Sequence, residues 1–260
     1  MRIFFTCLIL FALVQPNHSQ QISAKEWIVT GSELGLALGV ELFGKPYLTP
    51  DEPRFSNPNS FDRLMRNKLW SGLENQDNAR VWSDRLIYGV SMSSLVWGPL
   101  LANNTNEAIL INARVFAANS LLTNIVKMSA ARERPYHHFN TRPSEGSKDF
   151  TSFYSGHSSV AFSQAVANAM ILSRSYPEHD SMIWSTLLSA AGLTAYLRIA
   201  GDMHYFSDVI TGAAMGSLVA LTVTRIELNR FDKANNDTSA LFKYQGTGSN
   251  FMVSFKIPLG

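Results

Sequence analysis

Eight residues that could do chemistry lie in three short polar segments of a chain whose longer stretches are apolar. The first segment holds two cations separated by six residues. The second opens a predicted helix with a serine, a glycine and a histidine, and the third holds an arginine, a histidine and an aspartate. Together these residue types suit the binding and cleavage of a phosphate ester. In chain order they are Lys127, Arg134, Ser155, Gly156, His157, Arg198, His204 and Asp208.

Each residue type has a distinct use at a phosphate. A phosphoryl dianion needs fixed positive donors around its oxygens, for which arginine supplies a planar fork and lysine a point charge. Backbone N–H groups at a glycine-containing helix start can add to the same cradle. His204 and Asp208 are four residues apart, so on a helix they share a face and the carboxylate can accept from the imidazole. A histidine held in this way can attack phosphorus, while His157 protonates the leaving oxygen.

Each segment also has a simpler structural explanation. Cations at the end of a helix commonly complement its dipole, and a serine and glycine before a helix can be no more than a cap. A single first-turn histidine is often a satisfied core residue, and a lone His–Asp pair is often structural. His137 and His138 either line the mouth of the site or form an exposed loop pair. The combination of all three segments favours the chemical interpretation.

The three segments together resemble the signature of the type 2 phosphatidic acid phosphatase (PAP2) superfamily, which includes bacterial class A acid phosphatases and vanadium haloperoxidases. That signature is a Lys, six residues, Arg-Pro; then Pro-Ser-Gly-His; then Ser-Arg, five residues, His, three residues, Asp. The resemblance covers residues 85–227, and two positions depart from it. Tyr154 replaces the usual Pro and Leu197 the usual Ser, which we expect to affect substrate shape rather than the chemistry.

The resemblance implies roles for these residues. His204 would be the nucleophile that forms a phosphohistidine intermediate, Asp208 would orient it, and His157 would be the general acid. No metal or other cofactor would be required, and vanadate would be a phosphate-mimicking inhibitor. The alternative is a vanadium-dependent haloperoxidase, in which the same anion pocket holds vanadate as cofactor. The phosphate-binding groups would be Lys127, Arg134, Arg198 and the backbone amides of Ser155 and Gly156.

Composition limits the class of partner. Of the 260 residues, 46% are hydrophobic and 16% charged, which excludes a disordered chain and a charged coiled coil. The net charge of +2 provides no broad basic surface, so nucleic acid is not an expected partner. We expect a phosphorylated small molecule or a lipid phosphate or pyrophosphate as substrate, with membrane surface contact as an open question.

The N-terminus has the pattern of a secretory signal. Arg2 precedes an apolar run over residues 3–14, and the small Ser19 is a plausible cleavage position. The alternative is a buried N-terminal helix. With cleavage near residue 20, the single cysteine, Cys7, is lost, and the mature protein has no disulfide or Cys-ligated metal. The sequence therefore predicts an exported phosphatase, periplasmic or otherwise extracytoplasmic, either free or membrane-associated.

The remaining pattern predicts an all-α fold, a bundle of about six core helices with the site at one end. We divide the chain into a signal (1–20), N-terminal helices with a Pro-rich loop (21–82), a PAP2-like catalytic bundle (83–227) and a tail with a possible β-hairpin (228–260). Gly212 and Gly216 predict a close helix approach. The uncharged runs 86–102, 182–197 and 209–224 fall short of about 20 residues, which favours a soluble bundle over a membrane-spanning one.

Overall fold

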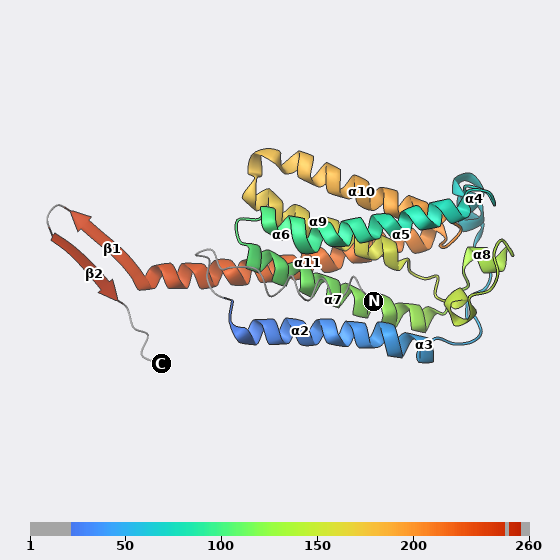
Figure 1. Cartoon of the computed structure of the whole chain (residues 1–260), viewed down its shortest axis with the longest axis horizontal. Coiled ribbons are helices and arrows are strands. Elements are labelled where there is room, and N and C mark those ends of the chain that lie inside the picture. The colour runs from blue at the N-terminus through green and yellow to red at the C-terminus, as the bar shows by residue number, and fades with distance from the viewer. Residues whose placement is uncertain (1–21, 248–249, 256–260) are drawn as a thin grey trace.

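The computed structural model describes the backbone of residues 22–247 and 250–255 and the side chains of residues 22–234. Within these residues the chain forms an elongated bundle of helices, which confirms the predicted all-α fold (Figure 1). The predicted signal, residues 1–20, lies outside the described residues. The α-helices are α2 (Ala24–Gly39), α3 (Lys45–Leu48), α4 (Ser60–Leu69), α5 (Gln76–Met92), α6 (Gly98–Leu101), α7 (Thr105–Ala130), α8 (Pro135–His138), α9 (Gly156–Ser175), α10 (Asp180–Ala200) and α11 (Phe206–Leu241).

Shorter helical segments and two strands complete the described chain. The π-helical segments Val40–Gly44 and Ser93–Trp97 continue α2 and α5, and the 3-10 turns are Gly146–Phe150 and Pro177–His179. The strands β1 (Phe242–Thr247) and β2 (Asn250–Phe255) pair antiparallel in the region where the sequence predicts a hairpin.

Asparagine side chains begin two of the helices. Asn59 precedes α4 and caps it by accepting from the backbone N–H of Asp62 at 2.8 Å. Asn104 caps α7 in the same way through the N–H of Glu107. The α7 helix ends at Ala130, and the next residue, Ala131, has a left-handed φ of 43° that turns the chain into the polar loop.

Helix α9 lies at the centre of the bundle, where it packs against α5, α7, α10 and α11. Helix α11 approaches α9 very closely, because two glycines of α11 face the backbone at the start of α9. A Cβ at Gly212 would lie 2.6 Å from the carbonyl oxygen of Ser155, and one at Gly216 would collide with the carbonyl oxygen of Ser159. The predicted close approach is therefore confirmed, and it fixes the first turn of α9 against α11.

The outer surface of the bundle is apolar, whereas its interior is rich in small and polar side chains. Three segments are long and apolar enough to cross a membrane: Ala24–Leu48, Thr105–Ala130 and Phe206–Ala234. The sequence favoured a soluble bundle because its uncharged runs were shorter than about 20 residues. The third segment extends well beyond the run 209–224, so that argument no longer holds. Large side chains at least half exposed include Ile28, Leu36, Leu42, Phe43, Trp82, Tyr88, Trp97, Leu100, Ile125, Ile210, Leu218 and Ile226.

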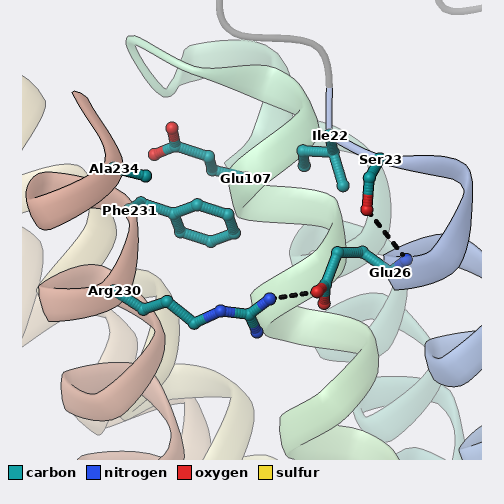
Figure 2. Close-up of a pocket in the computed structure, with 7 residues that line it drawn as sticks. All are labelled: Ile22, Ser23, Glu26, Glu107, Arg230, Phe231 and Ala234. Carbon is teal, nitrogen blue, oxygen red and sulfur yellow. Dashed lines mark hydrogen bonds and ion pairs between the residues drawn. The ribbon is translucent and has the colours of Figure 1, made fainter. Parts of the chain in front are cut away.

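The two ends of the bundle hold different elements and contacts. At one end α7 and α10 finish and α5, α9 and α11 begin, next to α4 and α8 (Figure 1). At the other end, Glu26 of α2 pairs with Arg230 of α11 (Figure 2). Deeper in the bundle, the buried Arg114 donates to Glu26 and Glu227 at 2.7 Å each, which ties α2, α7 and α11 together.

Candidate active site

The imidazole of His204 is buried, with an exposed fraction of 2%. His204 lies in the short loop between α10 and α11. Its Nδ1 atom is 2.8 Å from the carbonyl oxygen of Ser152. Because a carbonyl oxygen can only accept, Nδ1 carries the hydrogen, and in the neutral ring Nε2 keeps its lone pair. This is the tautomer that a nucleophilic histidine needs.

Asp208 does not hold His204 directly, so the expected hydrogen bond between them is absent. The Nδ1–Oδ2 separation is 3.8 Å. The expectation assumed one continuous helix, whereas α11 begins only at Phe206 and leaves His204 in the loop. The Oδ2 atom of Asp208 instead accepts from the hydroxyl of Ser152 at 2.6 Å and from the N–H of Tyr205 at 2.9 Å.

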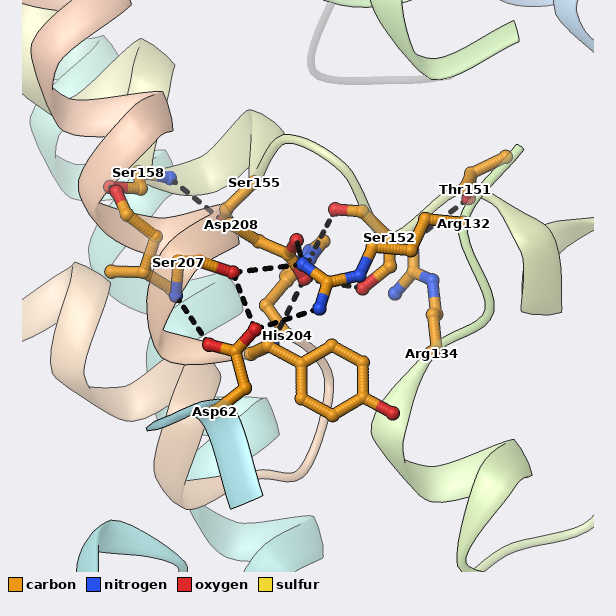
Figure 3. Close-up of polar contacts among 12 residues, drawn as sticks. Asp62, Arg132, Arg134, Thr151, Ser152, Ser155, Ser158, His204, Ser207 and Asp208 are labelled. Carbon is orange, nitrogen blue, oxygen red and sulfur yellow. Dashed lines mark hydrogen bonds and ion pairs between the residues drawn. The ribbon is translucent and has the colours of Figure 1, made fainter. Parts of the chain in front are cut away.

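A second set of partners fixes Asp208 from the other side (Figure 3). The guanidinium of Arg132 donates to Asp208 Oδ1 at 2.5 Å and to Asp62 of α4 at 2.8 Å. Asp62 in turn accepts from the N–H and hydroxyl of Ser207. Sequence reasoning missed Asp62, Ser152 and Ser207, because each lies outside the three motifs and reaches the site only through the tertiary fold.

Three cations converge on His204 from different elements. Lys127 lies in the last turn of α7 and donates to the carbonyl oxygen of Thr151 at 2.5 Å. Arg134 lies between α7 and α8 and donates to the hydroxyl of Thr151 at 3.1 Å. Arg198 lies in the last turn of α10 and is 3% exposed. Burial and the charges on Arg134, Lys127 and Arg198 together lower the pKa of His204 well below its usual range.

Two of these cations hold donors without a partner. Within the described residues, the Nε atoms of Arg134 and Arg198 are buried and make no hydrogen bond. An unsatisfied buried guanidinium N–H is costly, so such donors mark a place where an acceptor binds. Because both belong to cations that surround His204, the acceptor that fits is an anion beside this imidazole.

His157 lies in the first turn of α9 and is held by a carboxylate that the sequence motifs do not contain. Its Nε2 atom is 2.9 Å from Oδ1 of Asp84, on α5. Burial and the charges on Arg198 and Arg134 outweigh Asp84 and lower the pKa of His157 to about 4. Asp84 also accepts from Nη1 of Arg198 at 2.9 Å, so His157 lies next to one of the cations that act on His204.

The start of α9 differs from the predicted phosphate cradle. The N–H of Ser155 donates to the carbonyl oxygen of Asp208 at 3.0 Å, so this amide is engaged in holding α9 against α11. The hydroxyl of Ser155 caps α9 by accepting from the N–H of Ser158. A Cβ at Gly156 would lie 3.5 Å from Cε of Lys127, so the start of α9 lies beside this cation. The Ser155 amide is therefore already engaged, and the role of the Gly156 amide stays a prediction.

Neighbouring residues shape the loops around the site. Tyr154, at the position where the signature has Pro, is 1% exposed and accepts from the hydroxyl of Thr123 at 3.2 Å. His137 and His138 both contact the carboxylate of Glu133, at 2.5 and 3.1 Å. The described residues contain no group of three or more His, Cys, Asp or Glu side chains arranged to hold a metal ion.

These features define a cluster of buried cationic side chains and two histidines at one end of a helical bundle. Residues 108–232 match the family model of the PAP2 superfamily, which confirms the resemblance predicted from the three sequence segments. No curated protein matches the sequence significantly. Among solved structures, the chain is similar to the first transmembrane PAP2-type phosphatidylglycerolphosphate phosphatase from Bacillus subtilis. The two share 19% sequence identity with a TM-score of 0.44, covering 88% of this chain and 95% of that chain.

Proposed function

We propose that this protein is a phosphatase that hydrolyses a lipid phosphate or pyrophosphate through a phosphohistidine intermediate. The observation that carries the proposal is the pair of unpartnered guanidinium donors, on Arg134 and Arg198, beside the buried imidazole of His204. The match of residues 108–232 to the PAP2 superfamily supports phosphatase chemistry independently of this geometry.

In the proposed first step, Nε2 of His204 attacks phosphorus and the bond to the leaving oxygen breaks. The hydrogen bond from Nδ1 to Ser152 stabilises the positive charge that the ring acquires. Lys127, Arg134 and Arg198 hold the phosphoryl oxygens and neutralise their charge during transfer. The protonated imidazole of His157 gives its proton to the leaving oxygen.

In the second step, water replaces the histidine on phosphorus. The neutral His157 left by the first step takes a proton from this water, which attacks the phosphohistidine and releases inorganic phosphate. His204 and the protonated His157 are thereby restored. We propose that no metal is needed, because three cationic side chains already supply the positive charge around His204.

The proposed substrate class follows from the surface of the bundle. Three segments have the length and composition of membrane spans, and their outward side chains are large and apolar. Trp82 and Trp97 are more than half exposed, as interfacial anchors are. A phosphatase embedded in this way meets substrates that lie in the bilayer, so we propose a lipid phosphate or pyrophosphate, on the extracytoplasmic side if the N-terminal segment acts as a signal.

Activity of the detergent-solubilised protein on phosphatidic acid, polyprenyl pyrophosphate and a soluble monoester tests this proposal. We expect turnover of at least one lipid substrate, unaffected by EDTA. His204→Ala and His157→Ala should each lose most activity while the helical circular dichroism is unchanged. Turnover confined to the soluble monoester would remove the lipid assignment, and activity lost with EDTA and restored by a divalent metal would remove the mechanism.

A further inference from the structure

Asp84 joins the predicted general acid to one of the phosphate-binding cations. One oxygen of its carboxylate, Oδ1, lies 2.9 Å from Nε2 of His157 and 2.9 Å from Nη1 of Arg198. Asp84 is on α5, outside both the three motifs and the residues matched by the family model. Its side chain is 42% exposed, whereas that of Arg198 is 4% exposed, so the carboxylate lies between the buried cation and the outer part of the site.

The contact determines which nitrogen of His157 can transfer a proton. Burial opposes ionisation of Asp84, but the hydrogen bond from His157 and the charge on Arg198 outweigh it and lower the pKa of Asp84. An ionised carboxylate only accepts, so Nε2 of His157 carries a hydrogen that points to Asp84. The proton that leaves during catalysis must then come from Nδ1.

Asp84 also opposes the cations around His157. Arg198 and Arg134 act on His157 from α10 and the loop after α7, Arg80 lies near Asp84 on α5, and His204 is the neighbouring titratable group. The arginine charges disfavour the imidazolium form of His157, and His204 is neutral. The hydrogen bond and the charge of Asp84 favour it, so Asp84 counteracts the loss of the protonated acid.

We propose that Asp84 is a positioning residue for the general acid His157, which it orients through Nε2 and whose protonated form it favours. This inference rests on the proposed function. It is distinct from a purely structural ion pair between Asp84 and Arg198, which would affect every substrate equally. A general acid matters most when the leaving group is a poor one, because a stable leaving anion departs without a proton.

The test compares Asp84→Asn with the parent protein on two soluble substrates, an alkyl phosphate with an alkoxide leaving group and p-nitrophenyl phosphate with a stable phenolate. We expect kcat/KM for the alkyl phosphate to fall by about 10²–10⁴-fold, the usual contribution of general acid catalysis, and to change little for p-nitrophenyl phosphate. The alkaline limb of the pH profile should move to lower pH, because the imidazolium loses its anionic partner.

Three controls make the result decisive. Asp84→Glu keeps the carboxylate and should restore much of the alkyl phosphate activity and the pH limb. Asp77→Asn changes an exposed carboxylate on the same helix and should leave both substrates unaffected. In the background of His157→Ala, Asp84→Asn should cause no further loss, because the two residues act as one unit.

An equal fall for both substrates, or no change for either, would overturn the inference while leaving the phosphatase assignment intact. If Asp84→Asn does not fold, Asp84→Glu is the deciding variant. An alkaline limb of the pH profile and a leaving-group dependence identical to those of the parent protein would support the proposal. An equal loss of activity on both substrates would reject it. Failure of the parent protein to hydrolyse any phosphate ester would instead reject the proposed function.

Discussion

His204 and Asp208 are linked through Ser152 rather than by a direct hydrogen bond. The imidazole donates to the carbonyl oxygen of Ser152 at 2.8 Å, and the hydroxyl of the same serine donates to Asp208 at 2.6 Å. The carboxylate therefore orients the imidazole by fixing the position of a loop. The contribution of Asp208 can therefore be tested separately from that of the Ser152 carbonyl, because the serine hydroxyl can be removed without removing the carbonyl that holds the imidazole.

Ser152→Ala should reduce turnover without abolishing it. The variant removes a hydrogen bond to a charged acceptor, which is worth about 1.5 kcal/mol and corresponds to about a tenfold loss in kcat. Ser173→Ala is the matched control, because its buried hydroxyl has no hydrogen-bond partner among the described residues. Steady-state kinetics on one substrate would check both variants, and an unchanged kcat for Ser152→Ala would contradict the relay.

The ionisation of the two histidines predicts higher activity at acidic pH. Burial and the charges on Arg134 and Lys127 lower the pKa of His204, so the nucleophile stays neutral in mildly acidic solution. Burial and the charge on Arg198 lower the pKa of His157 to about 4, so its protonated form is depleted as the pH rises above that value. We expect kcat/KM to fall by about tenfold per pH unit on the alkaline side, after correction for substrate ionisation.

Bound phosphate changes this profile in a defined direction. Its negative charge favours the imidazolium of His157 and raises the pKa of that group in the complex. The alkaline limb of kcat should therefore lie at higher pH than that of kcat/KM, and His157→Gln should lack the limb. A kcat/KM that increases from acidic to neutral pH would contradict the assignment of His157 as the acid.

Gly216 should tolerate no side chain. Gly216→Ala places a methyl group against the carbonyl oxygen of Ser159 in α9, so α9 and α11 must separate. We expect destabilisation by about 1–3 kcal/mol, as for overpacking in a tight interface, with reduced activity because α9 carries His157. Gly192→Ala is the control, since nothing lies within 4 Å of its Cβ position. Thermal unfolding in detergent that ranks the two variants equally would contradict the predicted packing.

Arg114 should be essential for stability but not for chemistry. Arg114→Met leaves the carboxylates of Glu26 and Glu227 without their buried partner, which should cost about 3–5 kcal/mol. Arg174→Ala breaks an exposed pair with Asp232 and should cost at most about 1 kcal/mol. The melting temperatures of both variants give the comparison. A melting temperature of Arg114→Met close to the parent value would contradict the structural role.

Sequence reasoning grouped the histidines and cations by their residue types and motif spacing, and the structure places them at helix ends and loops at one end of the bundle. It could not place Asp84 or Asp62, since each reaches the site from a helix far away in the sequence. It also misjudged the contact between His204 and Asp208, because α11 begins only at Phe206 and so does not include His204. The Ser155 amide was misassigned for a related reason: its partner, the carbonyl oxygen of Asp208, is set by the packing of α9 on α11.

Direct detection of phosphohistidine tests the central claim, that His204 attacks phosphorus. The parent protein would be mixed with substrate, quenched in alkali within the first turnover and digested, and the peptide that contains residue 204 analysed by mass spectrometry. The account predicts a phosphate on His204 that is labile in acid and absent from His204→Ala. Turnover of a phosphate ester with phosphate found on another residue, or with His204→Ala as active as the parent protein, would contradict it.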